Sequence, residues 1–309
     1  MELHPEARAV IDLYGSLDMP AIETLSPPEA RASRASLRVP SNQPCREIDD
    51  IDAGGVSARR YRNTATGDAT GLLVWIHGGG WVTGDLDGAD PVARSLAVLT
   101  GHTVLSVDYR LAPEDPFPAG LDDCHAALTW ASEHAATLRI DPARIAIGGD
   151  SAGANLAAVV ANETTVPLVH QLLVYPVTDA RASRPAHHNE SYLDERNDLF
   201  LTAAAMTWFV DQYLAGTQVA HDDPRVSPLH ANADVLASGP PATVFTAGFD
   251  QLRDEGAHYA QRLAGAGVPT SHVHFAAHTH GFFAMHTALG DARMAQAAAA
   301  QALCDAFGS

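Results

Sequence analysis

A serine flanked by glycines is the first feature of this sequence that suggests chemistry. Residues 149–153 read Gly-Asp-Ser-Ala-Gly, after the apolar run 145–147 and before a stretch of small residues. This pattern of strand, sharp turn and helix would raise the hydroxyl of Ser151 above the edge of a sheet, and the glycines would let strand and helix pack closely. The pattern predicts Ser151 as the nucleophile of an acyl transfer, although such a short motif also occurs in ordinary tight turns.

A second glycine-rich segment supplies candidate hydrogen-bond donors. The apolar run 72–76 leads directly into His77 and three consecutive glycines. Because glycines let the backbone turn sharply, the N–H groups of Gly78 and Gly79 are expected to point into a cavity. There, with the N–H of Ala152, they would hold the oxyanion of a tetrahedral intermediate. A phosphate-binding loop is disfavoured, since no Lys-Ser/Thr pair follows the glycines. His77 is expected to be structural.

The general base and its orienting acid are expected after the nucleophile, in loops that follow later strands. Asp250 and His280 each follow a short apolar run, which gives the chain order Ser, Asp, His. His280 would accept the serine proton and return it to the leaving group, while Asp250 would orient the imidazole. Asp254 and Glu255 are rival acids, but they lie at the start of a predicted helix, where capping and the helix dipole explain them better.

The elements that must position these residues alternate along the chain. Strands are predicted at 57–61, 72–76, 103–107, 145–147, 168–174, 243–246 and 271–275. Helices are predicted at 91–99, 119–134, 154–162, 255–264 and 291–307. Several strands are wholly apolar, as in a mostly parallel sheet that is covered on both faces. The alternation therefore predicts an α/β fold with helices on both sides of the sheet.

Two segments lie outside this alternation and are expected to cover one edge of the sheet. Residues 1–45 are predicted to form an N-terminal cap, with a helix at 4–17 and a Pro- and Ser-rich tether up to Pro44. Residues 179–220 are predicted as a cap insertion, because they form a long excursion with one helix at 202–214. The core would then consist of residues 46–178 and 221–309.

Composition excludes several partner classes. The 309 residues carry 37 acidic and 19 basic side chains, a net charge of −18, and no lysine. Such a charge repels phosphate backbones and anionic lipids, so neither nucleic acid nor a membrane is expected as a partner. The scattered Cys45, Cys124 and Cys304 argue against a disulfide framework. A cytoplasmic location is expected, since we see neither a leader pattern nor an apolar run long enough to span a bilayer.

Several motifs, in this order and spacing, resemble the hormone-sensitive-lipase-like family of microbial carboxylesterases, from about Val56 to the C-terminus. The matching segments are His-Gly-Gly-Gly-Trp at 77–81, Gly-Asp-Leu-Asp at 84–87, Val-Asp-Tyr-Arg-Leu-Ala-Pro-Glu at 107–114, Gly-Asp-Ser-Ala-Gly at 149–153, Tyr-Pro at 175–176, Asp-Pro-Arg-Val-Ser-Pro at 223–228, Asp250 with Leu-Arg-Asp-Glu at 252–255, and His-Gly-Phe at 280–282. One departure is Gln251, which stands where the family usually has proline.

The resemblance implies an α/β-hydrolase fold with a mostly parallel eight-stranded sheet, flanking helices and a helical cap. It also implies ester hydrolysis without a metal or cofactor. The family's site residues fall on the triad Ser151, Asp250 and His280 and on the oxyanion donors Gly78, Gly79 and Ala152. A homodimer is compatible with the resemblance, because some members of the family pair through an edge strand.

The expected substrate is a small-molecule ester with a short to medium acyl chain, since a capped site suits soluble substrates. Trp81 and Phe282 flank the proposed catalytic residues and are candidate substrate-binding residues. Two alternatives remain open: an amidase or peptidase with the same triad, and a non-catalytic small-molecule-binding protein on the same fold.

Four histidines stand at even-numbered positions of one segment, and this spacing suggests a metal site as a different interpretation. They are His272, His274, His278 and His280. An extended strand would place them on one face, but no accompanying carboxylate or thiol ligand is evident. The role of His280 as a base is the stronger hypothesis, and no metal is expected.

Overall fold

The computed structural model describes residues 2–64 and 67–309, which contain an eight-stranded sheet. The strand order is β1-β2-β4-β3-β5-β6-β7-β8; β2 pairs antiparallel with β1 and β4, and all other pairs are parallel. The strands are β1 (Glu47–Asp52), β2 (Ser57–Arg62), β3 (Thr70–Ile76), β4 (Thr103–Val107), β5 (Ile140–Asp150), β6 (His170–Val174), β7 (Ala242–Phe249) and β8 (Thr270–Thr279). The predicted mostly parallel sheet is thus confirmed.

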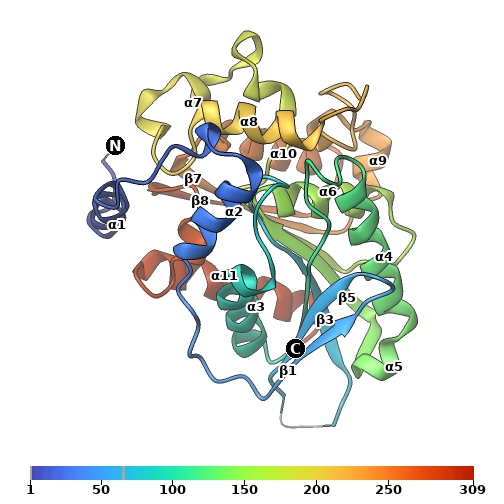
Figure 1. Cartoon of the computed structure of the whole chain (residues 1–309). Coiled ribbons are helices and arrows are strands. Elements are labelled where there is room, and N and C mark those ends of the chain that lie inside the picture. Colours follow the sequence, from blue (N-terminus) through green and yellow to red (C-terminus); the bar gives the residue numbers. More distant parts are fainter. Residues whose placement is uncertain (1, 65–66) are drawn as a thin grey trace.

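Helices cover both faces of the sheet (Figure 1). The α-helices are α1 (Pro5–Gly15), α2 (Pro27–Ser36), α3 (Leu86–Thr100), α4 (Ala119–Glu133), α5 (Ala135–Leu138), α6 (Ala152–Glu163), α7 (Glu190–Leu193), α8 (Ala203–Tyr213), α9 (Ala233–Ala237), α10 (Arg253–Gly265) and α11 (Gly290–Phe307). Short 3-10 helices are η1 (Ile22–Thr24), η2 (Ala180–Ser183), η3 (Pro185–His187), η4 (Glu195–Asn197), η5 (Pro228–His230) and η6 (Phe282–Ala284). No helix in the described ranges is long and apolar enough to cross a membrane.

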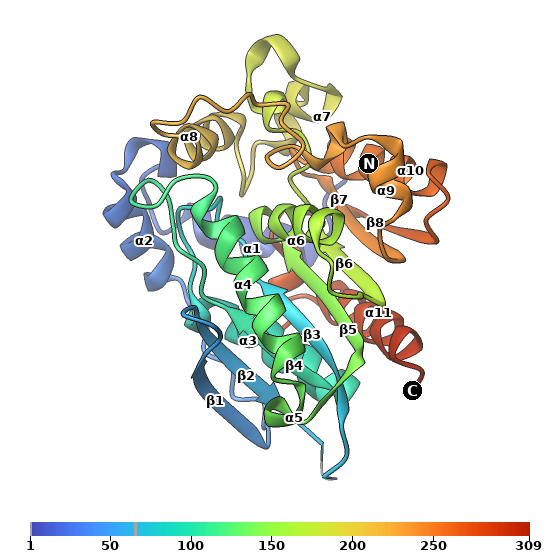
Figure 2. The ribbon, with the colours of Figure 1, turned by 90° about the vertical axis from the view of Figure 1, so that its right-hand side faces the viewer.

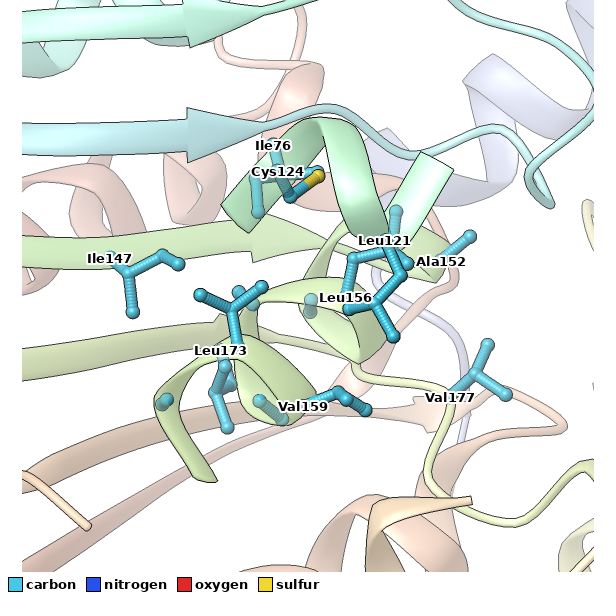
Figure 3. Close-up of a cluster of buried hydrophobic side chains, with 14 of the residues drawn as sticks. Ile76, Leu121, Cys124, Ile147, Ala152, Leu156, Val159, Leu173 and Val177 are labelled. Carbon is cyan, nitrogen blue, oxygen red and sulfur yellow. The ribbon is translucent and has the colours of Figure 1, made fainter. Parts of the chain in front are cut away.

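The alternation of side chains along β3 builds two cores. Leu72 and Ile76 point to one face and join residues of α4, α6 and α10, whereas Leu73 and Trp75 point to the other and join residues of α3 and α11. Figure 3 shows part of the first core, where Leu121 of α4 and Leu156 of α6 lie beside the sheet. Strands buried on both faces need apolar side chains at every position, which explains the unbroken apolar runs in the sequence.

One strand was not among the seven predicted from apolar runs, because four of its six residues are acidic. The edge strand β1 reads Glu-Ile-Asp-Asp-Ile-Asp, and its register places Asp49 opposite Arg60 and Asp50 opposite Arg59. Each of these pairs forms an ion pair. Opposite charges directly across an antiparallel pair stabilise it, so β1 is held by its partner strand rather than by its own burial.

The Pro- and Ser-rich stretch predicted as a tether contains a helix, α2. Pro27 and Pro28 occupy its first positions, where a missing N–H costs nothing, and the carboxylate of Glu29 accepts from the backbone N–H of Ser26 at 2.9 Å. The two prolines therefore mark the first residues of a helix, whereas the sequence pattern predicted irregular chain here.

The N-terminal segment and residues 179–220 lie together beyond one end of the sheet. η1 packs against α8, and α2 and α8 lie near each other in Figure 2 as well as in Figure 1. Arg31 ties α2 to the core: its guanidinium donates to the backbone carbonyls of Val82 and Ala112 and pairs with Glu114. This fixes the position of α2 relative to the glycine loop that follows β3.

Candidate active site

Ser151 lies in a strained turn between β5 and α6. Its φ is 56° and its ψ −120°, a conformation that costs free energy for a residue with a Cβ. The turn is held by hydrogen bonds from its N–H to the carbonyl of Val174 at 2.9 Å and to its own carbonyl from the N–H of Asn155 at 3.0 Å. A Cβ at Gly153 would lie 2.1 Å from the carbonyl oxygen of Ile76. The glycine therefore lets helix and strand approach closely around the serine.

Ser151, His280 and Asp250 form a continuous chain of hydrogen bonds. Ser151 Oγ lies 3.0 Å from His280 Nε2, and His280 Nδ1 lies 2.9 Å from Asp250 Oδ2. Asp250 is buried, and its second oxygen accepts from the N–H of Leu252 at 2.9 Å. With the imidazole proton on Nδ1, every group has its partner: Ser151 donates to Nε2 and Nδ1 donates to Asp250. The structure thus brings together all three residues predicted as the triad.

The two rival acids have other partners. Asp254 accepts from the N–H of Ser191 at 2.8 Å and pairs with Arg253. Glu255 is buried and accepts from the N–H groups of Thr178 and Asp179, and burial raises the pKa of its carboxyl well above the usual range. Glu255 therefore joins α10 to the loop after β6.

The glycine loop differs from the prediction at one position. The N–H of Gly78 donates to Asp150 Oδ1 at 3.0 Å, so it is not available to an oxyanion, and the structure does not support Gly78 as a donor. The N–H groups of Gly79, Gly80 and Ala152 have no acceptor within residues 2–64 and 67–309. A Cβ at Gly79 would lie 2.1 Å from the carbonyl oxygen of Thr83, and the φ of Gly79 is 120°, so this position requires glycine.

Asp150 links the nucleophile turn to the glycine loop. It precedes Ser151 in the chain, and its carboxylate holds the first glycine of the loop after β3. Burial raises the pKa of the Asp150 carboxyl to about 6, although the hydrogen bond from Gly78 and the nearby His280 oppose the shift.

His77 has a structural role, as expected. It is buried, stacks on Tyr109 with ring centroids 4.4 Å apart, and its backbone carbonyl accepts from the Tyr109 hydroxyl at 3.0 Å. Burial lowers the pKa of His77, which favours the neutral ring. The base of the glycine loop is therefore a packed aromatic pair.

A cavity of about 280 Å³ opens beside Ser151 and His280. Part of its wall comes from the core: Trp75, Ala89, Val92, Tyr175, Ala284 and Met285. The rest comes from the glycine loop, the N-terminal segment and the insertion, including Tyr14, Arg34, Leu37, Phe200, Leu201 and Phe209. The indole N–H of Trp75 and the hydroxyl of Tyr175 have no partner among the described residues. No sequence motif marks the lining residues of the N-terminal segment or Phe200 and Leu201.

Trp81 and Phe282, predicted as substrate-binding residues, do not line this cavity. Trp81 is 1% exposed and stacks on Tyr213 with centroids 4.3 Å apart. Phe282 is fully buried and stacks on His278. Both residues lie close in sequence to proposed site residues, but their side chains are buried against other aromatic rings and do not reach the cavity.

The other histidines of β8 have separate partners. His272 and His274 both lie within hydrogen-bond distance of the Thr246 hydroxyl, at 2.8 Å each. His278 pairs with Asp291 at 2.8 Å. Within the described ranges, no group of three or more His, Cys, Asp or Glu side chains is placed to hold a metal ion.

Comparison with known proteins identifies the family. Residues 73–284 match the family described as alpha/beta hydrolase fold, which is more than half of the chain. The chain belongs to this family. The predicted fold is thereby confirmed, and Ser151, Asp250 and His280 of this α/β-hydrolase occupy the positions at strand ends where such a fold carries its site.

Named relatives make the assignment more specific. The α/β-hydrolase is 42% identical over 269 residues to carboxylic ester hydrolase LipN of Mycobacterium tuberculosis, covering 81% of this chain and 69% of LipN. It is 38% identical over 232 residues to ethyl acetate hydrolase of Pseudomonas putida, covering 72% and 70% of the two chains. A crystal structure of LAE6, an alpha/beta hydrolase enzyme from the metagenome of Lake Arreo in Spain, matches with a TM-score of 0.90 at 35% identity over 99% of both chains. The resemblance to the hormone-sensitive-lipase-like carboxylesterases, and the prediction of an ester hydrolase, are confirmed.

The raised pKa of Asp150 predicts a pH-dependent cost to stability. In the unfolded chain the carboxyl ionises near its ordinary pKa of 3.8, but in the folded chain only near 6. Between these values the folded state binds more protons, so stability falls as pH rises, by about 2 to 3 kcal/mol in total. Asp150→Asn lacks this titration. Its unfolding free energy relative to wild type should therefore increase by that amount between pH 4 and pH 7.5, as measured by urea denaturation.

The control for this measurement is Asp222→Asn, which removes a negative charge at an exposed position. Because each variant is compared with wild type at the same pH, the contributions of all other titrating groups to the difference in unfolding free energy cancel. A stability difference between Asp150→Asn and wild type that stays constant from pH 4 to pH 7.5 would contradict the buried titration.

Proposed function

We propose that this chain hydrolyses carboxylic esters with short to medium acyl chains, by an acyl-enzyme mechanism that uses Ser151, His280 and Asp250. The observation that carries the proposal is the chain of two hydrogen bonds, 3.0 Å between Ser151 and His280 and 2.9 Å between His280 and Asp250. The serine at its end lies in a strained turn at the wall of a cavity. Such a chain is the arrangement that turns a weakly nucleophilic hydroxyl into an acyl acceptor.

In the first step Ser151 Oγ attacks the ester carbonyl carbon while its proton passes to His280 Nε2. The carbonyl oxygen becomes an oxyanion, and the unpaired N–H groups of Gly79, Gly80 and Ala152 donate to it. The carbon–oxygen bond to the alcohol then breaks, and the alcohol leaves with the proton from His280. The product of this step is an acylated serine.

In the second step water replaces the alcohol. His280 takes one proton from the water as its oxygen attacks the acyl carbon, and the oxyanion forms at the same donors. Collapse of this intermediate releases the carboxylic acid and returns the proton from His280 to Ser151 Oγ. Asp250 holds the Nδ1 proton in both steps and stabilises the transient imidazolium, which its burial makes more effective.

The substrate range follows from the cavity and from the relatives. A cavity of about 280 Å³ with largely apolar walls accommodates short to medium acyl groups better than long ones. The ethyl acetate hydrolase among the relatives is named for a small ester. A cytoplasmic location and a homodimer stay predictions.

Replacing the nucleophile tests the mechanism directly. Ser151→Ala should lower kcat for p-nitrophenyl butyrate by about 10⁴-fold or more while leaving the circular dichroism spectrum unchanged, because the attacking oxygen is gone but the fold is not. A p-nitrophenyl phosphonate should release one equivalent of nitrophenol from wild type and none from the variant. Ser238→Ala, at an exposed serine, is the control. Substantial residual turnover by Ser151→Ala would overturn the assignment.

The acid is tested by a pair of matched substitutions. Asp250→Asn should lower kcat by about 10³- to 10⁴-fold, because an amide neither stabilises the imidazolium nor fixes the required tautomer. Asp254→Asn should lower it less than tenfold, since Asp254 does not touch His280. If Asp254→Asn proved the more damaging of the two, the acid would be misassigned.

The acyl-chain preference is tested with a series of p-nitrophenyl esters from acetate to palmitate. We expect kcat/KM to be highest between about four and eight carbons and to fall steeply beyond about ten, where the chain no longer fits the cavity. A preference for palmitate would show that a larger space opens beside Ser151 and would contradict the proposed range.

A further inference from the structure

Arg34 of α2 lies in the wall of the catalytic cavity, where it is the only Lys or Arg side chain among the described lining residues. It also lines an adjoining cavity of about 350 Å³, formed largely by the N-terminal segment. Tyr14, Leu37 and Phe200 line both cavities with it. Arg34 therefore stands at the junction of the two spaces, among mostly apolar neighbours.

The guanidinium of Arg34 makes no hydrogen bond or ion pair in the described part of the chain, and the one charge effect on its pKa comes from Tyr14, which opposes the lowering by burial. Nearly all other arginines of this acidic protein are paired with a carboxylate or donate to a carbonyl. Within residues 2–64 and 67–309, only Arg8, Arg34 and Arg46 have side chains without a hydrogen bond or ion pair. Arg8 and Arg46 line neither of the two cavities.

Arg34 is an exposed residue that lines both cavities. The protein around it still removes part of its water, and this lowers the pKa of its guanidinium. The group nonetheless stays charged at neutral pH. A guanidinium with unused N–H donors gains from an anion placed against it when the two groups pair through two parallel hydrogen bonds.

The nearby carboxylates do not supply that anion. Asp85 accepts from the N–H of Gly88 and pairs with Arg38, and Asp150 accepts from Gly78. Glu23 lines the adjoining cavity, but among the described residues no carboxylate lies within 4.0 Å of the Arg34 guanidinium. The position of Arg34 is fixed independently, because Arg31, one turn earlier on α2, is tied to two carbonyls and to Glu114.

We propose that Arg34 binds an anionic group of the substrate, so that the enzyme prefers esters that carry a carboxylate remote from the scissile bond. The proposal rests on the proposed ester hydrolysis at Ser151. Planar guanidinium and carboxylate groups form two parallel hydrogen bonds, which orient as well as bind. The substrate class is then either half-esters of dicarboxylic acids or esters of hydroxy acids, depending on which side of the ester carries the anion. The net charge of −18 opposes the approach of anions, so this preference depends on the local site.

The experiment compares kcat/KM for esters that differ only in charge. Monoethyl adipate is paired with ethyl 6-methylheptanoate, in which an isopropyl group replaces the carboxylate. For an anion on the alcohol side, 4-acetoxybutyrate is paired with 4-methylpentyl acetate. Rates are followed by pH-stat titration at pH 7.5 in wild type, Arg34→Gln, Arg34→Lys and the charge-matched control Arg8→Gln.

In Arg34→Gln we expect the anionic-to-neutral ratio of kcat/KM to fall about tenfold or more for one of the two pairs. Arg34→Lys should retain part of the ratio, and Arg8→Gln all of it. The pair that responds shows which side of the ester carries the anion. An unchanged ratio for both pairs, or an equal loss on charged and neutral esters, overturns the proposal.

A measurement on wild type alone gives a second test. Adipate should inhibit hydrolysis of the neutral ester competitively at least about tenfold more strongly than uncharged adipamide, and equal inhibition would overturn the role of Arg34. Failure of the proposed function itself looks different: wild type would not hydrolyse the neutral esters, or Ser151→Ala would hydrolyse them as well as wild type.

Discussion

The backbone of Ser151 has a φ of 56°, a strained conformation that persists only because the surrounding contacts fix it. The N–H of Ser151 is bound to the end of β6, and Asn155 in the first turn of α6 ties that helix to the carbonyls of Val177 and Val226. Gly153 lets the helix press against the end of β3. The register of three parallel strands therefore determines where one hydroxyl lies.

The same turn also organises the second half of the site. Asp150 immediately precedes the strained serine, and its carboxylate accepts from the N–H of Gly78. The proposed nucleophile and the glycine loop that carries proposed oxyanion donors are thus connected through a single side chain. Burying a carboxylate to make this connection is unfavourable, and the pKa of about 6 for Asp150 reflects that cost.

The sequence predicted what depends on local patterns and missed what depends on tertiary partners. Apolar runs and glycine turns marked most of the parallel strands and the three residues of the proposed triad, because burial and sharp turns restrict residue type directly. β1 was missed because its carboxylates are balanced by arginines of the neighbouring strand. The use of the Gly78 N–H by Asp150, and the burial of Trp81 and Phe282, follow from three-dimensional packing that adjacency in sequence does not encode.

The two parts of the cavity wall come from different parts of the chain. The proposed catalytic residues and the glycine loop lie within residues 73–284, which match the family model, whereas Tyr14, Arg34 and Leu37 lie before this range. Substitutions in this N-terminal wall would change which ester is accepted without disturbing the strained serine or its base. The elements that position the serine and its base are therefore separate in the chain from the segment that shapes this part of the cavity, and the same fold can present differently shaped cavities to the same chemistry.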